Sequence, residues 1–200
     1  MRLRCKGQPL TEYYEYKLEA LKELERMNQS GKIALYYGDE SHICSQGYVP
    51  YGWQFPDEQV SILTERAYRI NCFALINRQC KCYWKMTEKH IDSLAILEYL
   101  EEFSLQIHKQ TFIILDNASV HKAKVIQQRI PYWQQRGLFI FLLPPYSPHL
   151  NIAETVWRKL KKEWLNPDDY LTKDSLLYAT NRALADLGCN TIIKYKLIFN

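Results

Sequence analysis

The feature that most constrains the fold is the stretch of residues 111–165, in which two apolar runs alternate with two candidate helices. The runs cover residues 112–115 and 138–143, and continuous apolar runs of this length are typical of strands covered on both faces. Two such strands, each followed by a helix, favour a parallel pair within a layered α/β fold. Meandering strand candidates earlier in the chain extend this prediction to a mixed sheet.

The two helices of this stretch have recognisable starts. Ser119 can cap a helix that reaches about residue 130. Three prolines between residues 144 and 148 interrupt the chain after the second apolar run, and Asn151 can then cap the next helix. That start places Glu154 in the first helical turn.

Carboxylates stand at the ends of these elements. Asp116 follows the first apolar run directly, Glu154 opens the second helix, and Asp39 follows an earlier apolar run at residues 33–37. Carboxylates held close together without a partner repel one another, and one of them takes up a proton. A divalent cation relieves this repulsion, and oxygen ligands of this kind suit Mg²⁺ or Mn²⁺.

Three segments resemble one family. They read YYGDE at residues 36–40, LDNASVH at 115–121 and LLPPYSPHLNIAETVWRKLK at 142–161, and they are similar to the catalytic domain of mariner-type bacterial insertion-sequence transposases. These enzymes belong to the DDE superfamily of endonucleases, named for two aspartates and a glutamate. The resemblance covers about residues 31–165. The chain departs from the family pattern at His149, where Asp is common, and at Ile152 and Ala153, where Pro and Ile are common.

The resemblance implies a fold, a site and a cofactor. The fold is a ribonuclease-H-like mixed sheet with helices on both faces, in which the first and fourth strands are neighbours. Asp39, Asp116 and Glu154 are then the catalytic residues and the ligands of two Mg²⁺ or Mn²⁺ ions. Glu40 follows Asp39 and points to the other side of a strand, so we interpret it as a supporting or structural residue.

The implied function is that of a DNA transposase catalytic domain. It would cleave phosphodiester bonds at transposon ends and transfer the freed 3′-hydroxyl into target DNA. Two alternatives remain at this point. A cellular nuclease or resolvase of the same fold would cut DNA without strand transfer, and an inactive transposase remnant would only bind DNA.

Basic residues near the carboxylates are candidates for DNA contacts. With 100° per residue, Arg158 and Lys161 lie on the Glu154 side of their helix, and the next residue, Lys162, adds a third charge. A solvated basic face explains these residues nearly as well. His121 can donate to a DNA phosphate or orient a carboxylate, although a histidine in a first helical turn is more often a surface residue.

The rest of the chain supplies further helices and strands. Leucine spacing predicts helices at residues 11–29 and 92–107, with Asp92 as the cap of the second, and Thr172 opens a last helix to about residue 187. We expect additional strands at residues 42–47 (turned back antiparallel), 60–64, 69–76 and 78–86 (at the sheet edge). The expected organisation is a connector helix (1–30), a catalytic domain (31–187) and a tail (188–200).

Composition and charge give weaker evidence on function and location than the motifs do. The net charge of +4 permits nucleic-acid binding without demanding it. No apolar run is long enough to cross a membrane and no secretory signal is visible, so we expect a cytoplasmic, nucleoid-associated protein. The resemblance implies transposon-end and target DNA as partners, a homodimer on DNA, and a helix-turn-helix region encoded upstream.

Overall fold

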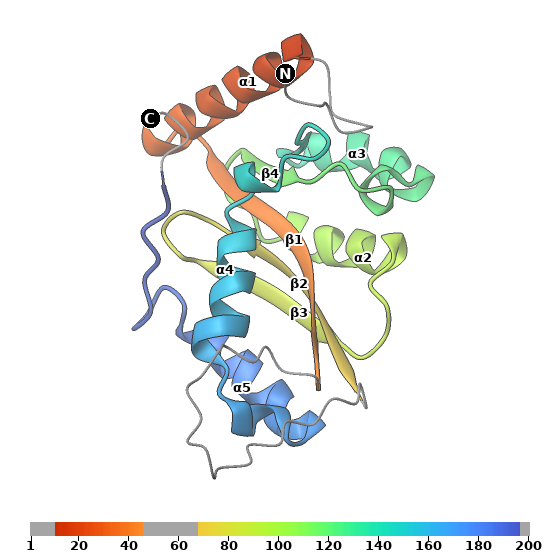
Figure 1. Cartoon of the computed structure of the whole chain (residues 1–200). Helices are drawn as coiled ribbons and strands as arrows, with labels where there is room; N and C mark the ends of the chain where they lie inside the picture. The colour runs from red at the N-terminus through yellow and green to blue at the C-terminus, as the bar shows by residue number, and fades with distance from the viewer. Residues whose placement is uncertain (1–10, 46–67, 197–200) are drawn as a thin grey trace, which may run out of the picture.

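The computed structural model describes residues 11–45 and 68–196, which form a five-stranded mixed sheet with helices on both faces (Figure 1). The strand order is β3-β2-β1-β4-β5. This arrangement confirms the predicted fold class. The strands are β1 (Ala34–Cys44), β2 (Arg69–Ile76), β3 (Cys82–Thr87), β4 (Thr111–Leu115) and β5 (Leu138–Leu142).

The central strand β1 joins an antiparallel half of the sheet to a parallel half. It pairs antiparallel with β2 and parallel with β4, so the predicted adjacency of the first and fourth strands is confirmed. Tyr37 of β1 lies opposite Ile114 of β4. Asp39 comes two residues later on β1, and Asp116 comes two residues after Ile114, just past the end of β4. The pairing therefore brings both to the same end of the parallel half.

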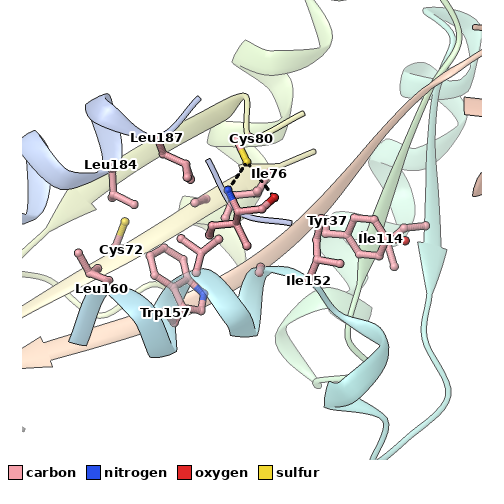
Figure 2. Packing of buried hydrophobic residues seen from close by; sticks show 14 of the residues in the cluster. Tyr37, Cys72, Ile76, Cys80, Ile114, Ile152, Trp157, Leu160, Leu184 and Leu187 are labelled. Atoms are coloured by element: carbon pink, nitrogen blue, oxygen red, sulfur yellow. Dashed lines mark hydrogen bonds between the residues drawn. The ribbon is translucent and has the colours of Figure 1, made fainter. Parts of the chain in front are cut away.

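Two core clusters lie on opposite faces of the sheet. On one face, α2 (Ser93–Ser104) and α3 (Lys124–Gln135) cover Ile113 and Leu115 of β4. The other face carries α1 (Thr11–Gln29), α4 (Ala153–Lys159) and α5 (Lys173–Asp186). Figure 2 shows Trp157 and Leu160 directed at β2, the strand that carries Cys72 and Ile76. Burial of this apolar surface holds α4 against the sheet.

Several predicted helix boundaries are confirmed by their caps. The carboxylate of Asp92 accepts the backbone N–H groups of Leu94 and Ala95 at the start of α2. Thr172 accepts the N–H of Ser175 at the start of α5. Gly188 follows that helix with φ +86°, a conformation that glycine adopts without steric cost.

Other boundaries were predicted wrongly. The strand predicted at residues 42–47, turned back antiparallel, is wrong for residues 42–44, because β1 continues through Cys44 and stays paired with β2 there. Residues 46 and 47 lie outside the described ranges. Ser119 does not cap a helix, since a short 3₁₀ turn, η1 (Val120–Lys122), comes first and α3 starts at Lys124. The helix also continues past Pro131, where burial of Trp133 compensates for the lost backbone hydrogen bond. The predicted strand at 60–64 lies outside the described residues.

No helix in the described ranges has the length and apolar character needed to span a bilayer. The described chain starts at one end of α1, and its C-terminal end lies near the other end of this helix, where α1 leads into β1 (Figure 1).

Candidate active site

Asp39 lies in the interior of β1, next to a position that needs glycine. A Cβ on Gly38 would come within 2.6 Å of Leu115 Cδ2 and 3.0 Å of Leu75 Cδ2, so two buried leucines would have to move in a close-packed core. Asp39 itself is half-buried and pairs with Ala74 of β2. The expectation that this aspartate stands at a strand end is therefore wrong, and the continuing strand fixes its backbone on both sides.

Asp116 follows the last residue of β4, and its side chain is 48% exposed. Its Oδ1 accepts the backbone N–H of Ala118 at 3.0 Å, which closes a turn after the strand. The same oxygen lies 2.7 Å from Nδ1 of His121. The turn and the histidine together define the direction of this carboxylate.

His121 is fully buried, and this contradicts its predicted role as a DNA contact. Its side chain has 0% exposure, so a phosphate could not reach it. Its second ring nitrogen, Nε2, lies 3.0 Å from Oε1 of Glu40. The other possibility raised by the sequence, that His121 orients a carboxylate, agrees with these contacts. A surface location for a histidine in this turn was the commoner expectation, and it is wrong here.

Glu154 reaches the site from the first turn of α4, as predicted. Asn151, one residue before the N-cap Ile152, holds this turn in place. Its Oδ1 accepts the N–H of Ala153 at 3.1 Å, and its Nδ2 donates to the carbonyl oxygen of Gly38 at 3.0 Å. The buried carboxamide thus ties the start of α4 to β1 beside Asp39, which is more than the helix capping that the sequence predicted.

The three predicted carboxylates line one pocket of about 410 Å³. The loop of residues 143–148 forms one side of this pocket, and the turn after β4 forms another. Three further polar or charged side chains that line it are Asn117, Lys122 and Asn151. The structure therefore brings together residues that are up to 115 positions apart in the sequence (Asp39 to Glu154).

The carboxylates of this pocket have pKa values that are shifted in different directions. Burial, together with the charges of Glu154, Glu40 and Asp116, raises the pKa of Asp39 to about 8. Asp116 behaves in the opposite way, because the hydrogen bond from His121 lowers its pKa. For His121, burial alone would lower the pKa, but the hydrogen bonds and charges of Asp116 and Glu40 outweigh it and raise the pKa to about 10. The ring is protonated at neutral pH and can donate from both nitrogens.

The donor set suits a hard divalent cation. Oxygen ligands are what Mg²⁺ and Mn²⁺ prefer, and the raised pKa of Asp39 reflects negative charge that a cation would neutralise. Within residues 11–45 and 68–196, however, no three acidic, histidine or cysteine side chains form a ready-made metal cluster. The pocket presents the donors without holding them in a finished coordination shell.

The predicted basic residues lie along the same helix and its continuation. Arg158 is exposed on α4, and Lys162 is exposed on the π-helical turn η3 (Leu160–Trp164). Lys161 is half-buried, and burial lowers its pKa against the opposing influence of Cys44, Glu154 and Asp39. Lys161 therefore lies on the carboxylate side of the helix, while Val156 and Leu160 are buried on the other side, as the periodicity indicated.

Two residues at the pocket were missed as candidate site residues. Lys122 is exposed and lines the pocket, and its charge contributes to the low pKa of Asp116. Tyr146 also lines it, with 70% of its surface exposed and with φ +57°. Its position in the proline loop was the only available signal, because left-handed backbone at a residue other than glycine cannot be read from the sequence.

Comparison with known proteins agrees with this geometry. Residues 34–177 match the family described as DDE superfamily endonuclease, which is more than half of the chain. No curated protein sequence matches. Among solved structures, the catalytic domain of Mos1 mariner transposase is similar with a TM-score of 0.54 and 13% identity, over 94% of this chain and 91% of that one.

Larger assemblies contain the same fold. The Mos1 strand transfer complex matches with a TM-score of 0.58 and 12% identity, over 94% of this chain and 62% of that chain. The Mos1 paired-end complex with Mn gives a TM-score of 0.55 at 12% identity, over 94% and 63%. This chain thus spans less than two thirds of the Mos1 chains in those complexes.

The sequence resemblance to mariner-type transposase catalytic domains is therefore confirmed by a family match over residues 34–177 and by a shared ribonuclease-H-like fold. The pocket between β1, β4 and α4 lies inside the matched region. The chain belongs to the DDE superfamily endonucleases.

Proposed function

We propose that this chain is the catalytic part of a DNA transposase. In this proposal Asp39, Asp116 and Glu154 bind divalent metal ions, and the chain cuts transposon-end phosphodiester bonds and transfers the 3′-hydroxyl into target DNA. The observation that carries the proposal is the shared pocket of the three carboxylates, in which the pKa of Asp39 is raised to about 8. Such a surplus of negative charge is costly unless a cation or a proton neutralises it.

The roles of the residues follow from where they sit. Asp39 is fixed by the continuous strand β1, Asp116 by its turn, and Glu154 by the attachment of α4 to Gly38. Two Mg²⁺ or Mn²⁺ ions, when bound, supply activation of the attacking oxygen and stabilisation of the leaving oxygen. The chain contributes the ligands and their spacing, and in-line attack at phosphorus requires no covalent bond between DNA and protein.

Basic residues are proposed to hold the DNA backbone. Arg158, Lys161 and Lys162 follow Glu154 along α4 and η3, and Lys122 lines the pocket beside Asp116. Phosphate contacts of this kind position DNA without reading its sequence. This arrangement would place the backbone across the pocket, between the basic side of α4 and the turn after β4.

Further partners are part of the proposal. Solved Mos1 relatives are described as paired-end complexes with the left transposon end, with Mn and with Mg. By analogy we propose transposon-end and target DNA as partners, a homodimer that joins two ends, and recognition of the ends by a helix-turn-helix region encoded upstream.

The test uses the chain together with the proposed upstream helix-turn-helix region, duplexes made from the inverted repeats that flank the coding sequence, Mn²⁺ or Mg²⁺, and a target plasmid. We expect cleavage at the repeat end and covalent joining of the cut strand to the plasmid, and both should disappear with a chelator or in Glu154→Gln. Cleavage without joining would instead identify a nuclease or resolvase. Binding without cleavage in either metal would contradict the catalytic proposal.

A further inference from the structure

A continuous chain of side-chain contacts runs behind the candidate metal ligands. Asp116 Oδ1 lies 2.7 Å from His121 Nδ1, and His121 Nε2 lies 3.0 Å from Glu40 Oε1. The histidine in the middle is completely buried, whereas the side chains of Asp116 and Glu40 are 48% and 25% exposed. A buried ring with a carboxylate at each nitrogen can adopt only one orientation.

The two carboxylates in this series of contacts come from neighbouring parts of the sheet. Asp116 follows β4, and Glu40 lies on the adjacent strand β1, next to the proposed ligand Asp39. Side chains alternate along β1, so that Leu35 and Tyr37 pack in the cluster with α4, while Tyr36 packs in the cluster with α2 and α3. Asp39 continues the first series and lines the pocket, and Glu40 continues the second series and faces His121. Strand β1 therefore supplies one proposed ligand and the support of another.

The contacts involve only one of the two carboxylate oxygens of Asp116. Oδ1 accepts from both Ala118 N–H and His121, and neither bond uses Oδ2. A carboxylate whose one oxygen is held by two donors has lost its rotational freedom about the terminal bond. The other oxygen then has a fixed direction relative to the pocket in which Asp39 and Glu154 lie.

We propose that His121, anchored by Glu40, is a positioning residue that fixes the Asp116 carboxylate for metal binding. The inference rests on the proposed function, since it assigns a purpose to the orientation of a proposed ligand. Packing alone does not account for the arrangement. Placing a histidine and two carboxylates at such a site costs desolvation energy, and apolar side chains of similar size would fill the space at least as favourably.

The expected magnitude comes from the behaviour of metal sites in general. Outer partners that orient a ligand typically change metal affinity or activity roughly 10–100-fold when they are removed. The effect should be graded here. His121→Ala removes the contact to Asp116, and His121→Gln keeps a side-chain donor of different length. Glu40→Gln leaves the ring in place, weakens its far anchor and also removes a negative charge near Asp39.

The experiment measures Mn²⁺ affinity by electron paramagnetic resonance, with the full chain and a short DNA duplex at pH 8. Thermal unfolding of each variant is recorded in parallel. We expect affinity to fall roughly 10–100-fold in His121→Ala and by less in His121→Gln and Glu40→Gln. The matched control is His108→Gln, because His108 is exposed in the segment between α2 and β4, and it should bind Mn²⁺ like the wild type.

The possible results separate this inference from the function on which it rests. Wild-type affinity in folded His121→Gln and Glu40→Gln, with affinity lost in Glu154→Gln, would overturn the positioning role and leave the metal site intact. A lower melting temperature with unchanged Mn²⁺ affinity would do the same, because it would show a packing role only. If His121→Ala does not fold, His121→Gln decides the matter. Absence of Mn²⁺ binding in the wild type would overturn the proposed function, and this inference with it.

Discussion

Two groups of charged side chains in this fold shift the pKa of a carboxylate in opposite directions. Between α2 and α3, Glu101 accepts from Arg129 Nε at 2.7 Å, from Trp133 Nε1 at 2.9 Å and from Arg136 Nη1 at 2.6 Å. The hydrogen bond from Arg129 is the main reason that the pKa of Glu101 falls to about 2. In the pocket, burial and three neighbouring carboxylates raise the pKa of Asp39 to about 8.

The difference shows which charged groups stabilise the fold and which do not. Glu101 is surrounded by donors, so its charge links two helices and is neutralised within the protein. Asp39 lies among like charges that the described residues only partly neutralise, through His121, Lys122 and Lys161. A protein that keeps such a cluster near neutral pH keeps it at a cost to stability, which points to a ligand that neutralises it.

Neutralising one glutamate in each group tests whether the two groups have different roles. Glu154→Gln should reduce DNA cleavage by at least about 10³-fold, because a lost metal ligand removes several kcal/mol of transition-state stabilisation. Its unfolding free energy should stay within about 0.5 kcal/mol, since Glu154 is an exposed residue. Cleavage assays and denaturant unfolding measure the two quantities.

Glu101→Gln is the matched control, and it should lower stability without lowering the cleavage rate. We expect a loss of about 1 kcal/mol in stability, because a quarter of the Glu101 side chain is exposed and solvent screens its ion pairs. Cleavage should remain near the wild-type rate. Equal loss of cleavage in both variants would mean that the two groups are not functionally distinct.

A pH titration of stability distinguishes the two groups, because the pKa shifts of Asp39 and Glu101 have opposite signs. The folded-state pKa of Asp39, about 8, lies above its unfolded value of about 3.9. The native state therefore holds a proton that the unfolded state releases, and the resulting stability is lost as pH rises from 4 to 8. Without metal, Asp39→Asn should be more stable than the wild type at pH 8, by on the order of 3 kcal/mol, with little gain at pH 4.

Glu101 gives the opposite sign in the same titration. Its folded pKa of about 2 lies below the unfolded value of about 4.3, so its contribution is present above pH 4 and disappears as pH falls through 2. The difference in stability between wild type and Glu101→Gln should shrink in acid. An Asp39→Asn variant that is less stable than the wild type at pH 8 would contradict the account of the pocket.

Measurements of DNA binding test whether the basic side of α4, which lies next to the carboxylate pocket, contacts phosphates. The double variant Arg158→Ala and Lys161→Ala should bind DNA more weakly and reduce the slope of log affinity against log salt by about 1.8, or about 0.9 per lost phosphate contact. The control removes two exposed lysines from the opposite end of the parallel strands, in Lys32→Ala with Lys109→Ala. Equal slopes for both double variants would indicate a general charge effect without a defined DNA path.

Tyr146 should give the smallest effect. Its backbone has φ +57° at the pocket wall, a conformation that costs a residue other than glycine about 1 kcal/mol. Tyr146→Gly should therefore stabilise the protein by about 1 kcal/mol. Tyr146→Ala keeps the strained backbone and should show no such gain, and a gain in both variants would assign the effect to the exposed ring.

Local signals predicted much of the fold. The apolar runs marked β4 and β5, and side-chain caps marked the starts of α2 and α5 correctly. These features depend on neighbouring residues, so a sequence displays them directly. The carboxylates were found because the segments around them resemble one family, and the pairing of β1 with β4 brings two of them to the same end of the sheet.

Long-range contacts account for what could not be predicted. The charged residues after Gly38 look like the end of a strand, yet pairing with β2 carries β1 through Cys44. His121 looks like a surface residue because its partner Glu40 is 81 positions away. Similarly, the contact of Asn151 with Gly38 spans 113 positions. Each of these depends on tertiary packing, which overrides local propensity.

Asp39, Asp116 and Glu154 are proposed to bind a divalent cation together, and anomalous scattering from Mn²⁺-soaked crystals would locate that cation. We expect Mn²⁺ density among the three carboxylates in the wild type, and weaker density in Asp116→Asn under the same soak. Density bound elsewhere, or an ordered set of carboxylates that stays without metal even in crystals with DNA, would contradict it.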